Sequence, residues 1–148
     1  MAVTNFDEYR DVYVVADTID DVVHPVTYEL IGQARRIAKE LGQLVQVMLL
    51  GENVQAEAEE LVAHGADIVH VFESPLLKYY TTDGYTKVLT DFFEDHKPNI
   101  LLIGATNNGR DLAPRMSGRM QNGVVADCTI LTVDTNEGLV EWTRPALG

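Results

Sequence analysis

Cysteine is scarce in this sequence: Cys128 is the only one among 148 residues. A single cysteine excludes a disulfide within the chain and favours a reducing compartment. The four histidines are scattered and show no paired spacing with cysteine or carboxylate residues, so the sequence predicts no metal site. A chain of this length buries roughly 68–70% of its unfolded surface on folding, so its core needs neither disulfides nor a metal ion.

Basic residues are also few, with 11 Lys and Arg against 23 Asp and Glu and a net charge of −12. Nucleic-acid binding requires a basic surface, so an acidic chain predicts no nucleic-acid partner. Binding to anionic membrane surfaces is disfavoured because like charges repel. No apolar run approaches the ~20 residues that cross a bilayer, so we expect no membrane insertion. The N-terminus resembles neither a secretory signal nor a transit peptide, which predicts a cytoplasmic location.

Glycine-rich phosphate loops are missing. The sequence contains neither GxGxxG nor GxxxxGK[ST], the motifs that bring backbone amides close to phosphate. Residues 16–25 follow the first predicted strand, contain no glycine and carry Asp17, Asp20 and Asp21, which would repel a phosphate. No nucleophile, base and oxyanion donor occur together. We therefore expect no catalytic residues and no enzyme activity in this chain.

The sequence does contain a regular alternation of strand and helix patterns. Apolar runs rich in β-branched residues predict buried strands at 12–16, 44–50, 67–72 and 99–104. Apolar residues at helical spacing predict helices at about 27–41, 53–64, 82–96 and from residue 111 to about 120. This alternation predicts one α/β domain with a mainly parallel sheet. Two β-rich runs at 128–134 and 139–144 flank a turn and predict a C-terminal β-hairpin.

Two helix starts are predicted from single residues. Asn53 is a suitable N-cap for the helix that ends before Gly65. Pro114 fits best within a first helical turn, where its missing N–H costs nothing, if that helix begins near Asp111.

The loop after the fourth predicted strand is the first candidate for a site. Ligands of open parallel sheets bind beyond the carboxyl ends of the strands. Residues 104–115 contain Gly104 and Gly109, which permit a tight turn or positive φ, while Asn107 or Asn108 can cap the following helix. A helix N-terminus in such a place is a candidate anion site.

Arg110 has two interpretations. Beside a helix N-terminus it could complete an anion site, or it could simply pair with Asp17 or Asp21 while its neighbours cap the helix. Arg115 and Arg119 are four residues apart and share one helical face. In so acidic a chain this basic stripe predicts either a docking face or ordinary solvated arginines.

Residues 101–131, LLIGATNNGRDLAPRMSGRMQNGVVADCTIL, and the ending TRPALG at 143–148 closely resemble the alpha subunit of electron transfer flavoproteins. The matching features are a strand that ends in GAT, the segment GRDLAPR, a basic helix, ADCT and the exit TRPA. The upstream segment LLKYYTTDGYTKVLTDFFEDHKP is similar to that family as well. The resemblance covers essentially the whole chain.

The resemblance implies a Rossmann-like three-layer fold of the adenine-nucleotide-hydrolase type that has lost its own nucleotide. Residues 1–148 would form the single N-terminal domain of the alpha subunit, and the FAD-binding C-terminal domain would be absent from this chain. FAD would belong to the full heterodimer, with none expected on this fragment alone. The implied partners are the beta subunit and, through the assembly, flavin-dependent dehydrogenases.

The resemblance also suggests two sets of site residues. The loop expected to face a flavin or NADH in the assembly comprises Asn107, Asn108, Gly109 and Arg110. The residues expected to contact the partner subunit or the missing domain are Arg115, Arg119, Trp142 and Arg144. The alternative function is a small adenine-nucleotide-binding protein that resembles universal stress proteins. The missing glycine-rich loop argues against this alternative.

Overall fold

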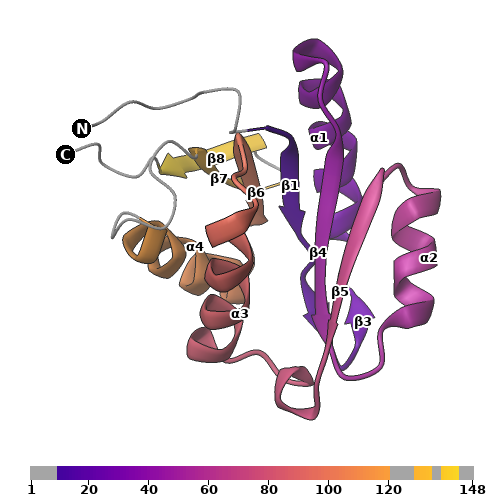
Figure 1. The fold of residues 1–148 in the computed structure, drawn as a ribbon, viewed down its shortest axis with the longest axis vertical. Helices are drawn as coiled ribbons and strands as arrows, with labels where there is room; N and C mark the ends of the chain where they lie inside the picture. Colours follow the sequence, from indigo (N-terminus) through magenta and orange to yellow (C-terminus); the bar gives the residue numbers. More distant parts are fainter. Residues whose placement is uncertain (1–9, 121–128, 135–137, 144–148) are drawn as a thin grey trace.

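The computed structural model describes residues 10–120, 129–134 and 138–143, with side chains described only in the first of these segments. Its main sheet has the strand order β5-β4-β1-β6-β7-β8 (Figure 1). The strands β1 (Val12–Val15), β4 (Val45–Gly51), β5 (Ile68–Glu73) and β6 (Ile100–Gly104) are parallel to their neighbours. β7 (Thr129–Asp134) lies parallel beside β6, and β8 (Gly138–Thr143) pairs with β7 in the antiparallel sense.

Helices cover both faces of the sheet and give three layers (Figure 1). α1 (Val26–Leu41) and α2 (Gln55–Ala63) pack on one face, and α3 (Thr82–Asp95) and α4 (Asn107–Arg119) pack on the other. A short 3-10 turn, η2 (Pro75–Leu77), connects β5 to α3. The predicted α/β domain with a parallel sheet is confirmed, and the predicted strands and helices lie within a few residues of the observed ones.

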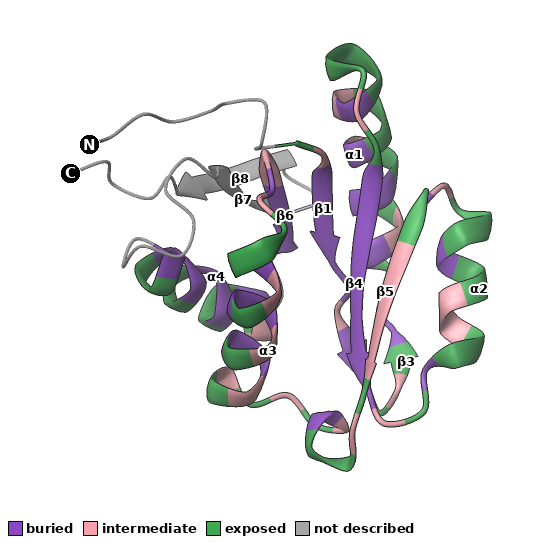
Figure 2. Ribbon diagram, viewed as in Figure 1, coloured by how far each residue is buried: buried purple, intermediate pink, exposed green. Residues whose placement is uncertain are grey.

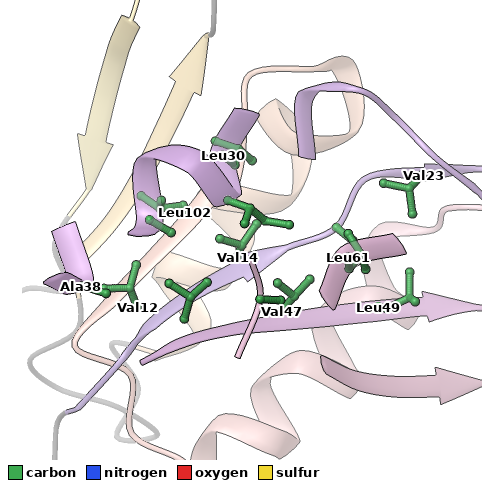
Figure 3. Packing of buried hydrophobic residues seen from close by; sticks show 14 of the residues in the cluster. Val12, Val14, Val23, Leu30, Ala38, Val47, Leu49, Leu61 and Leu102 are labelled. Atoms are coloured by element: carbon green, nitrogen blue, oxygen red, sulfur yellow. The ribbon is translucent and has the colours of Figure 1, made fainter. Parts of the chain in front are cut away.

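The two cores explain why the central strands are apolar at almost every position, with Gln46 of β4 as a buried polar residue. Along β1, Val12 and Val14 pack with α1 and α2, while Tyr13 packs with α3 and α4, and all three are at most 3% exposed. Figure 3 shows Val14 of β1 and Val47 of β4 in the cluster that also contains Leu30 of α1 and Leu61 of α2. Each such side chain contributes about 1.5–3 kcal/mol on burial. β4 is buried along its whole length, and β5 is partly exposed at the edge of the sheet (Figure 2).

The segment after β1 differs from the sequence-based expectation of a loop. It forms a small antiparallel hairpin of β2 (Thr18–Ile19) and β3 (Val22–Val23) near the N-terminus. Asp20 and Asp21 make its two-residue turn with φ of 51° and 65°, as a type I′ turn requires. Glycine or asparagine usually signals such a turn, so two aspartates gave no indication of it.

The end of α1 is as predicted. Gly42 has φ of 66°, and its N–H bonds the carbonyl oxygens of the last helical turn, which is the usual glycine stop of a helix. None of the helices within the described residues is both long and apolar enough to cross a membrane.

Candidate functional site

The strand order places the switch point of the sheet between β1 and β6. After β1 the chain crosses through α1 to β4 on one side, and it later returns to β6 on the other side of β1 (Figure 1). The segments that leave β1 and β6 therefore meet at the carboxyl edge, where an open α/β sheet normally binds its ligand.

The cavity at this switch point is almost filled. Its volume is about 20 Å³, whereas ligand pockets measure about 300–1,000 Å³. The cavity therefore has room for about one water molecule. The walls come from the ends of β1 and β6, from α4 and from the segment before α3; the polar residues among them are Asp17, Thr18, Tyr80, Tyr85 and Asn108. A nucleotide does not fit here while these side chains keep their positions.

Two tyrosines occupy much of this space. The Tyr85 hydroxyl donates to the Leu50 carbonyl oxygen at 3.4 Å and lies 3.2 Å from the Thr18 hydroxyl oxygen. The Tyr80 ring meets the Tyr85 ring edge to face, with 4.9 Å between ring centroids. Burial raises the pKa of both phenols. The tyrosines thus form a packed, hydrogen-bonded wall rather than an open stacking platform.

The N-terminus of α4 is capped from within the chain. Thr106 is the N-cap, and its hydroxyl oxygen accepts a hydrogen bond from the Gly109 amide at 3.0 Å. The same hydroxyl donates to the Asp17 carboxylate. The prediction that Asn107 or Asn108 caps this helix is therefore wrong. Asp17 supplies the negative charge that a helix N-terminus favours, in the place where a phosphate would bind.

The glycines of this loop serve close packing. Neither Gly104 nor Gly109 has positive φ, so that alternative of the sequence-based expectation is wrong. A Cβ at Gly109 would lie 1.8 Å from the Gly104 carbonyl oxygen, and one at Gly104 would lie 3.2 Å from a Val26 methyl. Only glycine at position 109 lets the first turn of α4 press against the end of β6.

The start of α4 also corrects the interpretation of Pro114. The helix begins at Asn107, four residues before the predicted start, and Pro114 lies inside it. Because proline has no N–H, Pro114 donates no hydrogen bond to the carbonyl oxygen of Arg110.

Two carboxylates bind the backbone amides that lead into α2. Asp21 accepts hydrogen bonds from the amides of Glu52 and Asn53 at 2.8 and 3.1 Å, and Glu73 accepts one from the Val54 amide at 2.8 Å. The N-cap of α2 is Val54, which makes no side-chain cap. The prediction that Asn53 caps this helix is wrong, because the helix begins one residue later than such a cap requires.

Both helix N-termini at this edge thus receive carboxylates of the chain itself. The charges of Asp17 and Asp21 disfavour a phosphate at this edge. Asp21 also occupies two amides of the β4–α2 loop, and Asp17 accepts from the hydroxyl that caps α4.

The four predicted loop residues do not share one surface. Asn107 and Arg110 are exposed, Asn108 is partly buried in the cavity wall, and Gly109 is buried. Within the part of the chain that the structure describes, Arg110 makes no ion pair, so its suggested pairing with Asp17 or Asp21 is wrong. Its guanidinium lines an open surface groove with Thr82, Asp111, Pro114 and Arg115.

The predicted basic stripe is only partly free. The Arg115 guanidinium donates to the Asp83 carboxylate at 2.9 Å, while Arg119 is exposed. Trp142 belongs to β8, where only the backbone is described, and Arg144 lies outside the described residues. The structure leaves the partner-contact prediction for these residues untested.

Asp111 fastens α4 to the start of α3. Its carboxylate accepts hydrogen bonds from the Thr82 hydroxyl and, at 2.8 Å, from the Tyr80 hydroxyl. The bond from Thr82, followed by that from Tyr80, holds the pKa of Asp111 below its ordinary value. This contact fixes the two helices that flank the groove beside Arg110.

Sequence reasoning missed two residues of this edge, Thr106 and Glu73. Thr106 had a local signal, because a threonine before a helix is a common N-cap. Glu73 bonds an amide 19 residues away in the sequence, and no local pattern could have assigned it.

Comparison with known proteins identifies the family to which the chain is similar. Residues 12–148 match the family model described as an electron transfer flavoprotein domain. The chain is 47% identical over 141 residues to the electron transfer flavoprotein subunit alpha of Megasphaera elsdenii. The aligned residues cover 95% of this chain and 42% of that protein. It is 46% identical over 140 residues to the lactate dehydrogenase (NAD(+),ferredoxin) subunit LctC of Acetobacterium woodii, covering 95% of this chain and 33% of that subunit.

A further relative is named as an acryloyl-CoA reductase electron transfer subunit beta, from Anaerotignum propionicum. The identity is 43% over 133 residues, which cover 90% of this chain and 36% of that protein. The chain thus spans less than half the length of the relatives it matches.

Proposed function

The chain belongs to the electron transfer flavoprotein family, and from this premise we propose that it is the N-terminal α/β domain of an alpha subunit. In this role it is a structural and partner-docking part of a heterodimeric, FAD-containing electron carrier. That carrier works in the cytoplasm between flavin-dependent dehydrogenases and an acceptor. The domain itself performs no catalytic step.

One observation carries this proposal beyond family membership: the ligand edge of the sheet is filled by the chain's own side chains. The cavity of about 20 Å³ and the carboxylates at the α2 and α4 N-termini do not fit the phosphates of a nucleotide. A sheet of the adenine-nucleotide-hydrolase type that no longer holds a nucleotide would have these properties. Its remaining use is to present surfaces to other parts of an assembly.

We assign FAD to a part of such proteins that this chain does not span, since the relatives are more than twice as long. FAD supplies reversible one- and two-electron transfer. Two of the relatives are named as subunits of a lactate dehydrogenase and of an acryloyl-CoA reductase. We propose that the part played by this domain is common to such assemblies.

Within the assembly, we propose that the loop Asn107–Arg110 faces the flavin or NADH, with Asn107 and Arg110 as its exposed side chains. Contacts to the beta subunit or to the rest of the alpha subunit are assigned to Arg115, Arg119, Trp142 and Arg144. Arg110→Ala should slow electron transfer in the assembly and leave the melting temperature almost unchanged, because its exposed guanidinium has no ion pair within the described residues. Unchanged transfer rates would contradict a cofactor-facing role.

The purified chain tests the whole proposal. We expect it to be colourless, to bind the cognate beta subunit, and to show no affinity for ATP or AMP tighter than ~10 μM in calorimetric titration. A yellow chain that retains stoichiometric FAD would overturn the cofactor assignment. Tight binding of ATP or AMP would instead support the adenine-nucleotide-binding alternative.

A further inference from the structure

The four most exposed large apolar side chains among the described residues all come from segments at the carboxyl end of the sheet. They are Leu76 (84% exposed), Tyr79 (65%), Val22 (59%) and Ile19 (58%). Figure 2 shows that β3 and the turn after β5 are both partly exposed at this end. Scattered surface apolar residues are normal, but a gathering of the most exposed ones marks an interaction site. We call these four residues the apolar rim.

The hairpin half of the apolar rim is held rigidly. Ile19 and Val22 are paired across the β2–β3 hairpin, whose turn needs two non-glycine residues with positive φ. Such residues persist only where the surroundings hold them. The Asp21 carboxylate does so by accepting hydrogen bonds from two amides of the β4–α2 loop, and Glu57 accepts one from the Val23 amide at 3.2 Å. Two apolar side chains are thus fixed in solvent at a conformational cost.

The other half of the apolar rim adjoins the same β4–α2 loop. Ser74 caps the η2 turn by accepting from the Leu76 amide at 3.2 Å, and buried Leu77 anchors the turn in the core. The Lys78 ammonium lies 3.9 Å from the Glu52 carboxylate and 5.7 Å from the centre of the Tyr79 ring. The hairpin and the η2 segment therefore both contact the β4–α2 loop, through Asp21 and Lys78.

The charge around the apolar rim is acidic. The same segments contain four carboxylates: Asp20, Asp21, Glu52 and Glu73. Lys78 forms an ion pair with Glu52. The bonds to Asp21 and Glu73 come from neutral backbone amides, which add no positive charge to this region. A binding partner must be apolar at its centre and basic around it.

We propose that the apolar rim docks the electron transfer flavoprotein beta subunit through a surface of that kind. The inference rests on the proposed function and adds the surface and its chemistry to it. Relatives of the chain are named as subunits of larger proteins, and a preformed, solvent-exposed apolar surface suits a lasting interface between subunits. A symmetric dimer through the rim would bring like charges together, which disfavours a second copy as the occupant.

The experiment compares three variants for binding to the purified beta subunit. Ile19→Thr with Val22→Thr keeps β-branched residues in the hairpin and places hydroxyls in the interface, so we expect roughly 10- to 100-fold weaker binding. Leu76→Gln changes the other half of the rim, in a separate element, and should weaken binding by roughly 3- to 10-fold. Val62→Thr is the matched control, because Val62 is 53% exposed on α2; it should bind like the unchanged chain.

The outcomes separate this inference from the proposed function. If the unchanged chain fails to bind the beta subunit, both are overturned. If the unchanged chain binds and the rim variants bind equally well, the inference alone is overturned. If sedimentation shows that the chain self-associates and the hairpin variant abolishes this, a second copy is the occupant and the inference is again overturned. Circular dichroism and hydrogen exchange of residues 12–23 establish that each variant is folded.

Discussion

The N-termini of α2 and α4 lie at the same edge of the sheet, and the chain satisfies them in different ways. α4 has a local cap, Thr106, with Asp17 behind it and glycine packing below it. α2 has no local side-chain cap. The backbone amides that lead into it donate to Asp21 and Glu73, which are 31 and 19 residues away from Glu52 and Val54. A helix end can therefore be closed to external anions by local packing or by long-range carboxylates, and the two routes should respond differently to mutation.

The largest expected effect is at the packed α4 end. Gly109→Ala would place a Cβ 1.8 Å from the Gly104 carbonyl oxygen, and backbone atoms cannot move aside cheaply. We expect it to lower the free energy of unfolding by about 3 kcal/mol or more. Urea denaturation followed by circular dichroism measures this.

Gly118→Ala is the matched control for that change. Gly118 lies in the same helix, and nothing lies within 4 Å of a Cβ placed there. Alanine should stabilise the chain at this position by up to ~1 kcal/mol, since it loses less backbone entropy on folding. Equal effects of the two substitutions would show that the α4 end is not fixed by close packing.

The second prediction contrasts the two aspartates. Asp21→Gly tolerates the positive φ at this position and removes the acceptor of two amides, so we expect a loss of about 2–3 kcal/mol. Asp17→Ala should cost only about 1 kcal/mol, because Thr106 still caps the helix. Thermal and urea unfolding of both variants measures the difference.

Asp21→Asn separates charge from geometry in this contrast. Asparagine keeps one acceptor oxygen and tolerates positive φ, so its stability should lie between those of the unchanged chain and Asp21→Gly. If Asp17→Ala proves as destabilising as Asp21→Gly, the distinction between a local and a long-range route is wrong.

The same contrast explains how far the sequence could predict the fold. Continuous apolar runs and period-3.6 patterns depend on neighbours within a few residues, and they placed the central strands and the helices to within a few residues. Gly42 was identified as the stop of α1 because its role depends only on the preceding turn. The parallel order of the sheet followed from the alternation of strands and helices, since crossovers are almost always right-handed.

The candidate site was predicted less completely because its contacts are not local. The loop after β6 was identified from the rule for open sheets, yet the partner of Thr106 is 89 residues away. The β2–β3 hairpin has an Asp-Asp turn, which forms here because the β4–α2 amides hold Asp21. Only the folded arrangement shows that the acidic first loop fills the edge as well as repelling phosphate.

The smallest expected effect concerns pH and the contact that Asp111 of α4 makes with the start of α3. Hydrogen bonds from Thr82 and Tyr80 hold the pKa of Asp111 below its ordinary value of 3.8. The folded state therefore favours the ionised form. The resulting stability is complete above that pH and is lost as pH falls through the lower folded-state value. Asp111→Asn should flatten this acid dependence, measured by urea denaturation between pH 2 and 6.

Thr82→Ala sharpens this last test by removing the stronger donor and leaving the carboxylate in place. The pKa of Asp111, followed by carboxyl NMR titration, should then move up toward its ordinary value. Because Asp111 is fully exposed, the change in stability should be smaller than those at Gly109, Asp21 and Asp17. A pKa that stays low after Thr82→Ala would mean that Tyr80 and Arg115, rather than Thr82, hold the charge.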